Sequence, residues 1–171
     1  AVNWLSILAT PLFWAVSLGA FFYSYYWYFI LTWVPSYLLT VHGYSNLKMG
    51  TILSVPLAVT AVTSLAAGTL ADKVIKKTGA APLTVRKAFV TGGFLCGCTI
   101  VILAWLPAGA PLLPLFLLSM GGMGFGVSNY WALTHLFTTA QSIGRAMGYQ
   151  NMVAQLAGVA APIVTGFLVG A

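Results

Sequence analysis

The sequence predicts an all-α protein, a polytopic bundle of transmembrane helices. Hydrophobic residues make up 60% of its 171 residues and charged residues only 5%, whereas a soluble domain has about 25% charged residues. The chain also has five apolar runs of at least the roughly 20 residues that one membrane-crossing helix needs. Strands of a membrane β-barrel would be about ten residues long with alternating polarity. We therefore expect an integral, multi-pass protein of the plasma (inner) membrane.

The five predicted helices follow one another with short connections. They cover residues 12–39, 47–71, 86–106, 112–137 and 143–170, and residues 1–171 form one transmembrane bundle. The connections contain helix breakers, such as His42-Gly43 and Pro107–Pro111. The exception is a longer basic loop, residues 72–87, between the second and third helices.

This basic loop fixes the expected orientation. It contains Asp72, the only acidic residue of the chain, and five of the seven cations: Lys73, Lys76, Lys77, Arg86 and Lys87. Loops rich in Lys and Arg stay in the cytoplasm, so we expect the loop and the N-terminus on that side. The net charge of +6 does not indicate a nucleic-acid partner, because the cations have no polar domain around them. The lipid bilayer is the expected environment.

The first predicted helix is crowded with aromatic residues. Tyr25, Phe29 and Trp33 follow at four-residue spacing and share one helix face. Tyr25 and Tyr26 lie near the middle of the helix, where an interfacial aromatic belt does not explain them. A buried tyrosine hydroxyl needs a hydrogen-bond partner. Two interpretations remain open: packing with the hydroxyl bonded to a backbone carbonyl, or the wall of a polar cavity.

The fourth and fifth predicted helices carry glycines and amides. Glycines in Met120–Gly126 allow close approach of helix backbones, and packing is favoured over a bending role. Asn129 lies beyond them, at a depth where an amide is costly unless it is paired. Asn151 and Gln155 lie one turn apart in the fifth helix. Because amides facing lipid would be costly, we expect this pair to face protein or a wet cavity.

No Asp, Glu, Lys or Arg lies deep in any of the five predicted helices. Proton coupling and binding of an ionic solute normally need such a group, so we expect that charge outside this chain. No nucleophile–base pair or metal-ligand cluster can be read from the sequence either. An enzyme is therefore not expected, and neither is a catalytic site, a metal site or a cofactor.

Three segments together resemble a known family. Gly68-x-Leu-Ala-Asp72-Lys73 resembles the loop signature of the major facilitator superfamily, in the longer form of its second copy. The segment from Gly144 to Gly166 is similar to the eleventh helix of these transporters, and Tyr28–Leu38 resembles the seventh helix of the anion:cation symporter branch. The resemblance implies helices seven to eleven of twelve, with the N-terminal six-helix half and the last helix absent.

The resemblance also implies a function and its residues. It implies a proton-coupled secondary transporter of small organic anions of the carboxylate type, working by alternating access around a midplane site. Its partners would be the solute, the coupling proton and the missing N-terminal half. The alternative is a non-transporting membrane fragment or degenerate half-protein that acts as a partner-binding scaffold. The implied solute-binding residues are Tyr25, Tyr26, Phe29, Trp33, Asn129, Asn151 and Gln155. The implied gating residues are Gly68, Asp72, Lys73, Arg86 and Arg145.

Overall fold

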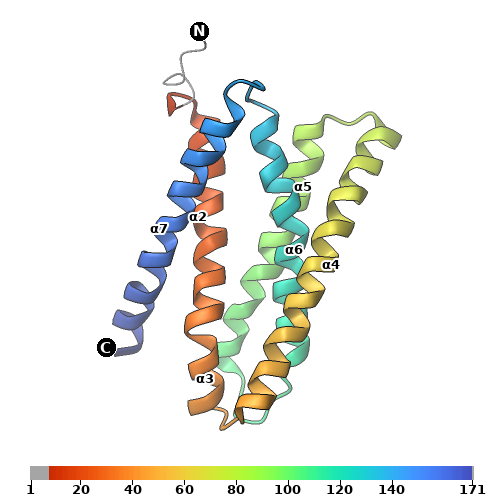
Figure 1. Cartoon of the computed structure of the whole chain (residues 1–171). Helices are drawn as coiled ribbons and strands as arrows, with labels where there is room; N and C mark the ends of the chain where they lie inside the picture. The colour runs from red at the N-terminus through yellow and green to blue at the C-terminus, as the bar shows by residue number, and fades with distance from the viewer. Residues whose placement is uncertain (1–7, 171) are drawn as a thin grey trace. The chain divides into compact units, whose positions relative to one another are not determined.

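The computed structural model describes residues 8–170, and within them every regular element is a helix (Figure 1). The all-α prediction is therefore confirmed. The chain divides into two compact units. One contains the residues up to Ser36 together with those from Leu133 on, and the other contains Tyr37–Ala132.

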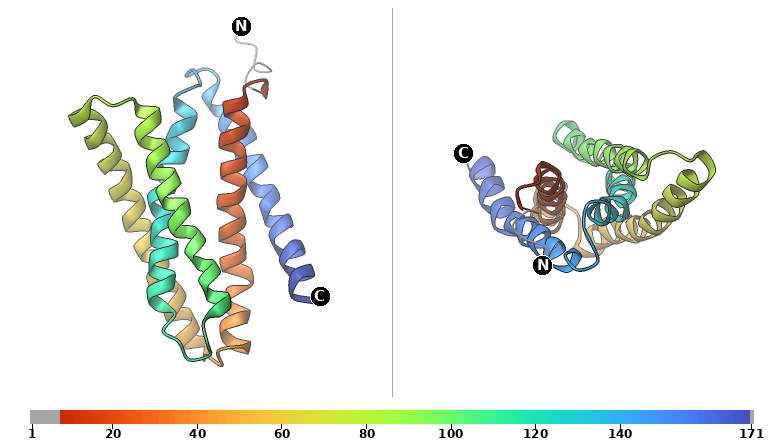
Figure 2. Two further views of the ribbon diagram at one scale, coloured as in Figure 1. Left: turned by 180° about the vertical axis from the view of Figure 1, so that it is seen from behind. Right: turned by 90° about the horizontal axis from the view of Figure 1, so that it is seen from above.

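The unit Tyr37–Ala132 is built on three long helices. These are α4 (Asn46–Thr78), α5 (Pro82–Cys98), which continues as a 3₁₀ helix over Thr99–Trp105, and α6 (Leu113–His135), which runs slightly past the unit. The view from above in Figure 2 shows α6 next to both α4 and α5. The glycines of α6 explain how it packs against two neighbours at once. A Cβ atom on Gly121 would lie 3.2 Å from Val59 of α4, and one on Gly126 would lie 3.5 Å from Phe94 of α5.

Two threonines of α4 add hydrogen bonds to this contact. Thr60 Oγ1 donates to the carbonyl of Met120 at 2.9 Å, and Thr63 Oγ1 donates to the carbonyl of Gly121 at 2.9 Å. On the other side of α6, Ser119 Oγ donates to the carbonyl of Gly97 of α5 at 2.8 Å. Small residues and hydroxyl–carbonyl bonds are the usual means by which membrane helices associate. The packing interpretation of the glycine-rich segment is confirmed.

The predicted basic loop, residues 72–87, is wrong in most of its extent. Helix α4 continues to Thr78 and α5 begins at Pro82, so only three residues connect them. Lys76 and Lys77 lie in the last turn of α4, where cations interact favourably with the helix dipole. Gly79 then ends the helix in the left-handed conformation, with φ of 67°, and donates its N–H to the carbonyl of Ile75. The polar composition of this segment indicated a loop, but the same charged residues are equally compatible with the C-terminal end of a helix.

The other unit consists mainly of α2 (Pro11–Thr32) and α7 (Ile143–Gly170), which lie side by side (Figures 1 and 2). The buried positions of α7 recur every three or four residues and are mostly small: Ala146, Gln150, Ala154, Ala157, Ala161 and Thr165. The first predicted helix, residues 12–39, is broken after Thr32, and a short α3 (Val34–Thr40) follows. Pro35 has no N–H to continue the hydrogen-bond pattern of α2, which accounts for the break.

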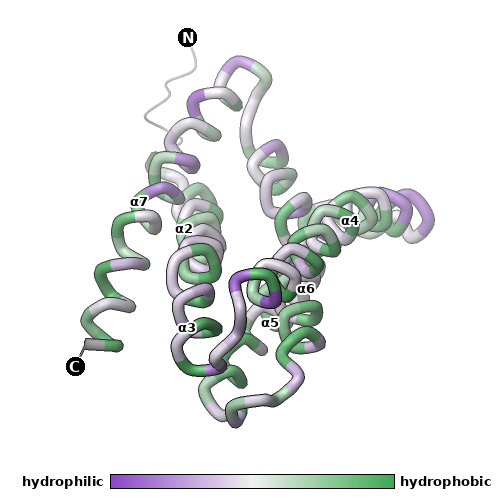
Figure 3. Tube along the Cα trace, turned by 60° about the horizontal axis from the view of Figure 1, so that its bottom comes forward, coloured by the Kyte–Doolittle hydropathy of each residue, from purple (hydrophilic) through white to green (hydrophobic). Residues whose placement is uncertain are grey.

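Three helices among the described residues are long and apolar enough to cross a membrane by length and composition. They are α4, α5 with its 3₁₀ continuation (Pro82–Trp105), and Ile143–Val169 within α7. Helix α2 has 22 residues, but its tyrosines and tryptophans lower its mean hydropathy. Figure 3 shows hydrophobic colours along the helices and hydrophilic colours at the C-terminal end of α4. This end of α4 carries Asp72, Lys73, Lys76 and Lys77.

Candidate functional site

The first candidate site is a polar cluster of three residues, one from each long helix of the unit Tyr37–Ala132. Arg86 of α5 donates from Nη2 to Asp72 Oδ1 of α4 at 2.8 Å, forming an ion pair. The same guanidinium donates from Nη1 to Asn129 Oδ1 of α6 at 3.2 Å. The Asp72 side chain is 57% exposed and that of Arg86 only 17%. We call these three residues the Arg86 cluster.

Asn129 forms the buried end of the Arg86 cluster. Its side chain is fully buried, and its amide nitrogen donates to the carbonyl of Phe125 at 3.3 Å and, at 3.5 Å, to that of Ala67 on α4. The Asn129 side chain therefore accepts a hydrogen bond from the Arg86 guanidinium and donates hydrogen bonds to carbonyls of two helices. The sequence predicted that this amide must be paired, but it did not identify Arg86, 43 positions away, as its partner.

The structure brings only some of the predicted gating residues together. Gly68 lies on the same helix as Asp72, and a Cβ atom there would lie 3.6 Å from Ser128 of α6, so α4 and α6 are close at this level. Lys73 lies exposed on α4. Arg145 lies on α7, in the other unit, and makes no ion pair within the part of the chain that the structure describes.

The second candidate site is the contact between α2 and α7. Tyr28 donates its hydroxyl to Gln155 Oε1 at 2.5 Å, and its ring lies over Gly158, where a Cβ atom would be 2.8 Å from Tyr28 Cζ. Tyr25 Oη lies 3.5 Å from Thr165 Oγ1. Trp33 packs near Gly166. Tyrosine hydroxyls of α2 thus pair with side chains of α7, and the predicted residues Tyr25, Trp33 and Gln155 all take part.

Tyr28 is a residue that the sequence reasoning missed. The prediction followed the four-residue spacing of Tyr25, Phe29 and Trp33, whereas Tyr28 lies three residues from Tyr25, a spacing that also shares a helix face. Of the other predicted solute-binding residues, Tyr26 packs edge to face against Trp27, with ring centroids 5.7 Å apart, and Phe29 is half-buried. Asn151 is exposed on α7.

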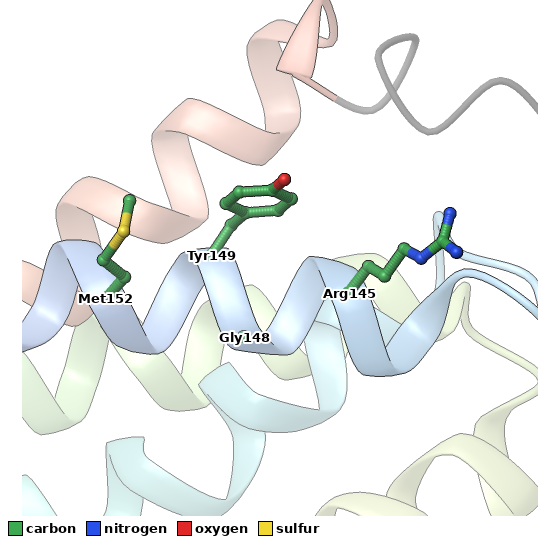
Figure 4. A pocket seen from close by; sticks show the side chains of 4 residues that line it. All are labelled: Arg145, Gly148, Tyr149 and Met152. Carbon is green, nitrogen blue, oxygen red and sulfur yellow. The ribbon is translucent and has the colours of Figure 1, made fainter.

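An open pocket lies on the first turns of α7. It has a volume of about 420 Å³ and is lined by Arg145, Gly148, Tyr149 and Met152. Figure 4 shows the side chains of Arg145, Tyr149 and Met152 projecting from the same side of α7, as their spacing of four and three residues requires. Asn151 and Gln155 are also exposed on α7, but they do not line this pocket. The pocket surface combines the cation of Arg145 with the hydroxyl group of Tyr149.

Buried hydrogen-bond donors also occur in the unit of α2 and α7. Gln150 is 1% exposed; its Oε1 accepts from Thr134 at 2.5 Å, while its Nε2 has no partner among residues 8–170. The indole nitrogen of Trp33 likewise has no partner within this range. Unpaired buried donors cost free energy, so each has to be satisfied by water, by a solute or by a segment outside the described residues.

We expect the Tyr28–Gln155 bond to contribute measurably to the α2–α7 contact. Tyr28→Phe and Gln155→Leu should each lower the free energy of unfolding by about 0.5–1.5 kcal/mol. The double variant should lose no more than the larger single loss, because both changes remove the same bond. Detergent unfolding followed by circular dichroism measures these values. Tyr25→Phe with Gln155→Leu is the control, and its losses should add. Additive losses for Tyr28 and Gln155 would contradict the pairing.

The fold and the two sites define a class: a multi-pass helical membrane protein with a charged cluster at a helix end and neutral polar groups between helices. The family model of the Major Facilitator Superfamily matches residues 1–162. The chain belongs to this superfamily. This match confirms the family resemblance and the prediction that the chain is an integral membrane protein. The family consists of membrane transporters, so the expectation that the chain is not an enzyme is also confirmed.

The chain is also similar to individual curated transporters. The chain is 28% identical over 144 residues to a probable galactarate/D-glucarate transporter of Bacillus subtilis, covering 84% of this chain and 31% of that protein. It is 31% identical over 153 residues to a hexuronate transporter of Bacillus subtilis, covering 88% and 36%. It is 31% identical over 153 residues to a D-galactonate transporter of Escherichia coli, covering 90% and 35%. The chain thus spans about a third of the length of these relatives.

Proposed function

We propose that the chain forms part of a secondary transporter of small organic anions, with sugar acids as the solute class. This proposal rests on the names of the three relatives above, which describe transporters of galactarate or D-glucarate, of hexuronate and of D-galactonate. All of these solutes combine carboxylates with several hydroxyl groups. The hydroxyl and amide groups of α2 and α7 suit the hydroxyl groups of such a solute, since each can donate and accept.

The carboxylate of the solute needs a different partner. The long helices carry no cation in their middle turns; Arg86 and Arg145 lie near the starts of α5 and α7. We propose that the charge that binds the carboxylate, and the group that couples transport to protons, lie in an N-terminal half that pairs with this chain. Alternating access would then rock the two halves about the solute. In this proposal the basic end of α4 faces the cytoplasm, as the positive-inside rule predicts.

A binding measurement tests the solute class. Galactarate, D-glucuronate or D-galactonate should raise the melting temperature of the complete protein that contains this chain, because a ligand stabilises the state that it binds. Galactose, which has the hydroxyl groups without the carboxylate, is the matched control and should cause no shift. Equal shifts with galactose would exclude an anion transporter. No shift with any sugar acid would favour the alternative, a partner-binding scaffold.

Site variants test the proposed solute-binding residues. Tyr25, Tyr26, Phe29, Trp33, Asn151 and Gln155 are proposed to form the wall of the solute site. Asn151→Ala in the complete protein should raise the half-saturation concentration for sugar-acid uptake about tenfold, the loss of one to two hydrogen bonds to the solute. Thr69→Ala, on the exposed face of α4, is the control. Normal uptake by a well-expressed Asn151→Ala variant would remove Asn151 from the site.

The Arg86 cluster is proposed to act in gating. It ties α4, α5 and α6 together at one helix end, and the exposed Asp72 is its accessible member. Asn129 is bonded within this cluster, so we propose that it positions Arg86 and does not contact the solute. Asp72→Asn should slow uptake several-fold with little change in solute affinity. Lost affinity together with a normal maximal rate would contradict a gating role. Lys48→Gln, on the same helix near its other end, is the control.

A further inference from the structure

Helix α4 is longer than a membrane crossing requires. Its 33 residues span about 50 Å at 1.5 Å per residue, whereas the hydrocarbon core of a bilayer is about 30 Å thick. Roughly a dozen residues of α4 therefore lie beyond the hydrocarbon. The last turns of α4 contain Lys73, Lys76 and Lys77, so a rigid helix carries these cations through the headgroup layer.

These three lysines share one face of α4 and have no anionic partner among residues 8–170. They follow at steps of three and one residues and all are exposed. The only acidic residue of the chain is Asp72. Its carboxylate is already bonded by Arg86, in the one ion pair found among residues 8–170. The lysines therefore present uncompensated positive charge at the membrane surface.

Exposed apolar residues precede the lysines on α4 and extend the surface that a phospholipid could contact. Leu70 is 45% exposed, and Leu70, Lys73 and Lys77 follow at i, i+3 and i+7 along one stripe of α4. Further into the membrane, Val62 is 66% exposed. Along the same helix the surface therefore changes from apolar to cationic in the direction in which a phospholipid changes from acyl chain to phosphate.

We propose that the C-terminal end of α4 binds an anionic phospholipid. The phosphate would lie against Lys73, Lys76 and Lys77, and the acyl chain would lie along Leu70 and Val62. Charge complementarity and the change from apolar to cationic surface select this partner. The attraction of cations to anionic lipid is about 1 kcal/mol for each Lys near the surface, which corresponds to about fivefold in affinity. This inference rests on the membrane setting and does not depend on the transported solute.

Native mass spectrometry of the protein in neutral detergent tests the proposal with phosphatidylglycerol as the probe. Lys77→Gln should weaken phosphatidylglycerol binding about fivefold, and Lys76→Gln with Lys77→Gln should weaken it further. Lys48→Gln removes the same charge near the opposite end of α4 and should leave binding unchanged. Phosphatidylcholine, with no net charge, should bind more weakly and equally to all variants. Each substitution is at an exposed position, and circular dichroism checks that the fold is kept.

Competition separates a lipid site from a general anion site. Glycerol 1-phosphate carries the same phosphate chemistry without acyl chains, and at equal concentration it should not displace phosphatidylglycerol. Displacement at equal concentration would show a free-phosphate site and overturn the proposal. Equal losses for Lys48→Gln and Lys77→Gln would show that only net charge matters, and would also overturn it. Phosphatidylglycerol binding that these lysine substitutions do not change would show that the lipid binds elsewhere, and would overturn the proposal as well.

Discussion

Gly93→Ala is expected to destabilise the α5–α6 contact by about 1–3 kcal/mol, the usual cost of overpacking. A Cβ atom on Gly93 would lie 2.6 Å from the backbone nitrogen of Gly126 and 2.7 Å from the carbonyl oxygen of Gly122. Both atoms belong to the α6 backbone, so no side-chain rotation can relieve the clash and the two helices must separate. Separation also lengthens the bond from Ser119 to the carbonyl of Gly97.

The neighbouring glycine provides a matched control. A Cβ atom on Gly92 meets nothing within 4 Å. Gly92→Ala should therefore leave stability unchanged or raise it by up to about 1 kcal/mol, because alanine is the better helix former. The free energy of unfolding in detergent, followed by circular dichroism, compares the two. Equal stabilities of the two variants would mean that α5 and α6 are not packed as described.

Arg86→Met is expected to lower the free energy of unfolding by about 1–3 kcal/mol. Methionine keeps most of the length of the side chain but leaves Asn129 Oδ1 buried without a donor, and an unsatisfied buried group has this cost. Asp72→Asn, at the exposed end of the same cluster, should cost about 0–1 kcal/mol, as expected for a surface ion pair. The buried amide should thus matter more to stability than the ion pair does.

A double variant tests whether this cost comes from the unsatisfied amide. Arg86→Met with Asn129→Leu replaces both partners by apolar side chains, so it should be no less stable than Arg86→Met alone. Additive losses would show that Arg86 and Asn129 act separately. If Asp72→Asn were as destabilising as Arg86→Met, the ion pair would be the main source of stability in the cluster.

Much of this architecture follows from composition and spacing. Long apolar runs require helices in a membrane because backbone groups there must be bonded internally, and the glycines of Met120–Gly126 identified a helix-packing segment before its neighbours were known. The Gly68–Lys73 motif indicated the family. These features depend on residues close together in the sequence, so local reasoning was sufficient for them.

The long-range pairings could not be predicted in this way. Arg86 and Asn129 lie on different helices, and only their relative placement shows that the amide accepts from the guanidinium. The same holds for Tyr28 and Gln155, which are 127 positions apart. The extension of α4 beyond residue 71 was missed for a different reason. Charged residues are typical of loops, yet Lys76 and Lys77 are equally favourable at a helix C-terminus.

Uptake of labelled solutes into proteoliposomes containing the complete protein tests the central proposal most directly. We expect D-glucarate, D-glucuronate or D-galactonate to accumulate when the outside is more acidic, and we expect a protonophore to abolish this accumulation. Labelled galactose should not accumulate. Absence of uptake for every sugar acid by a folded, correctly inserted protein, or equal uptake of galactose, would contradict the proposal that this chain is part of an organic-anion transporter.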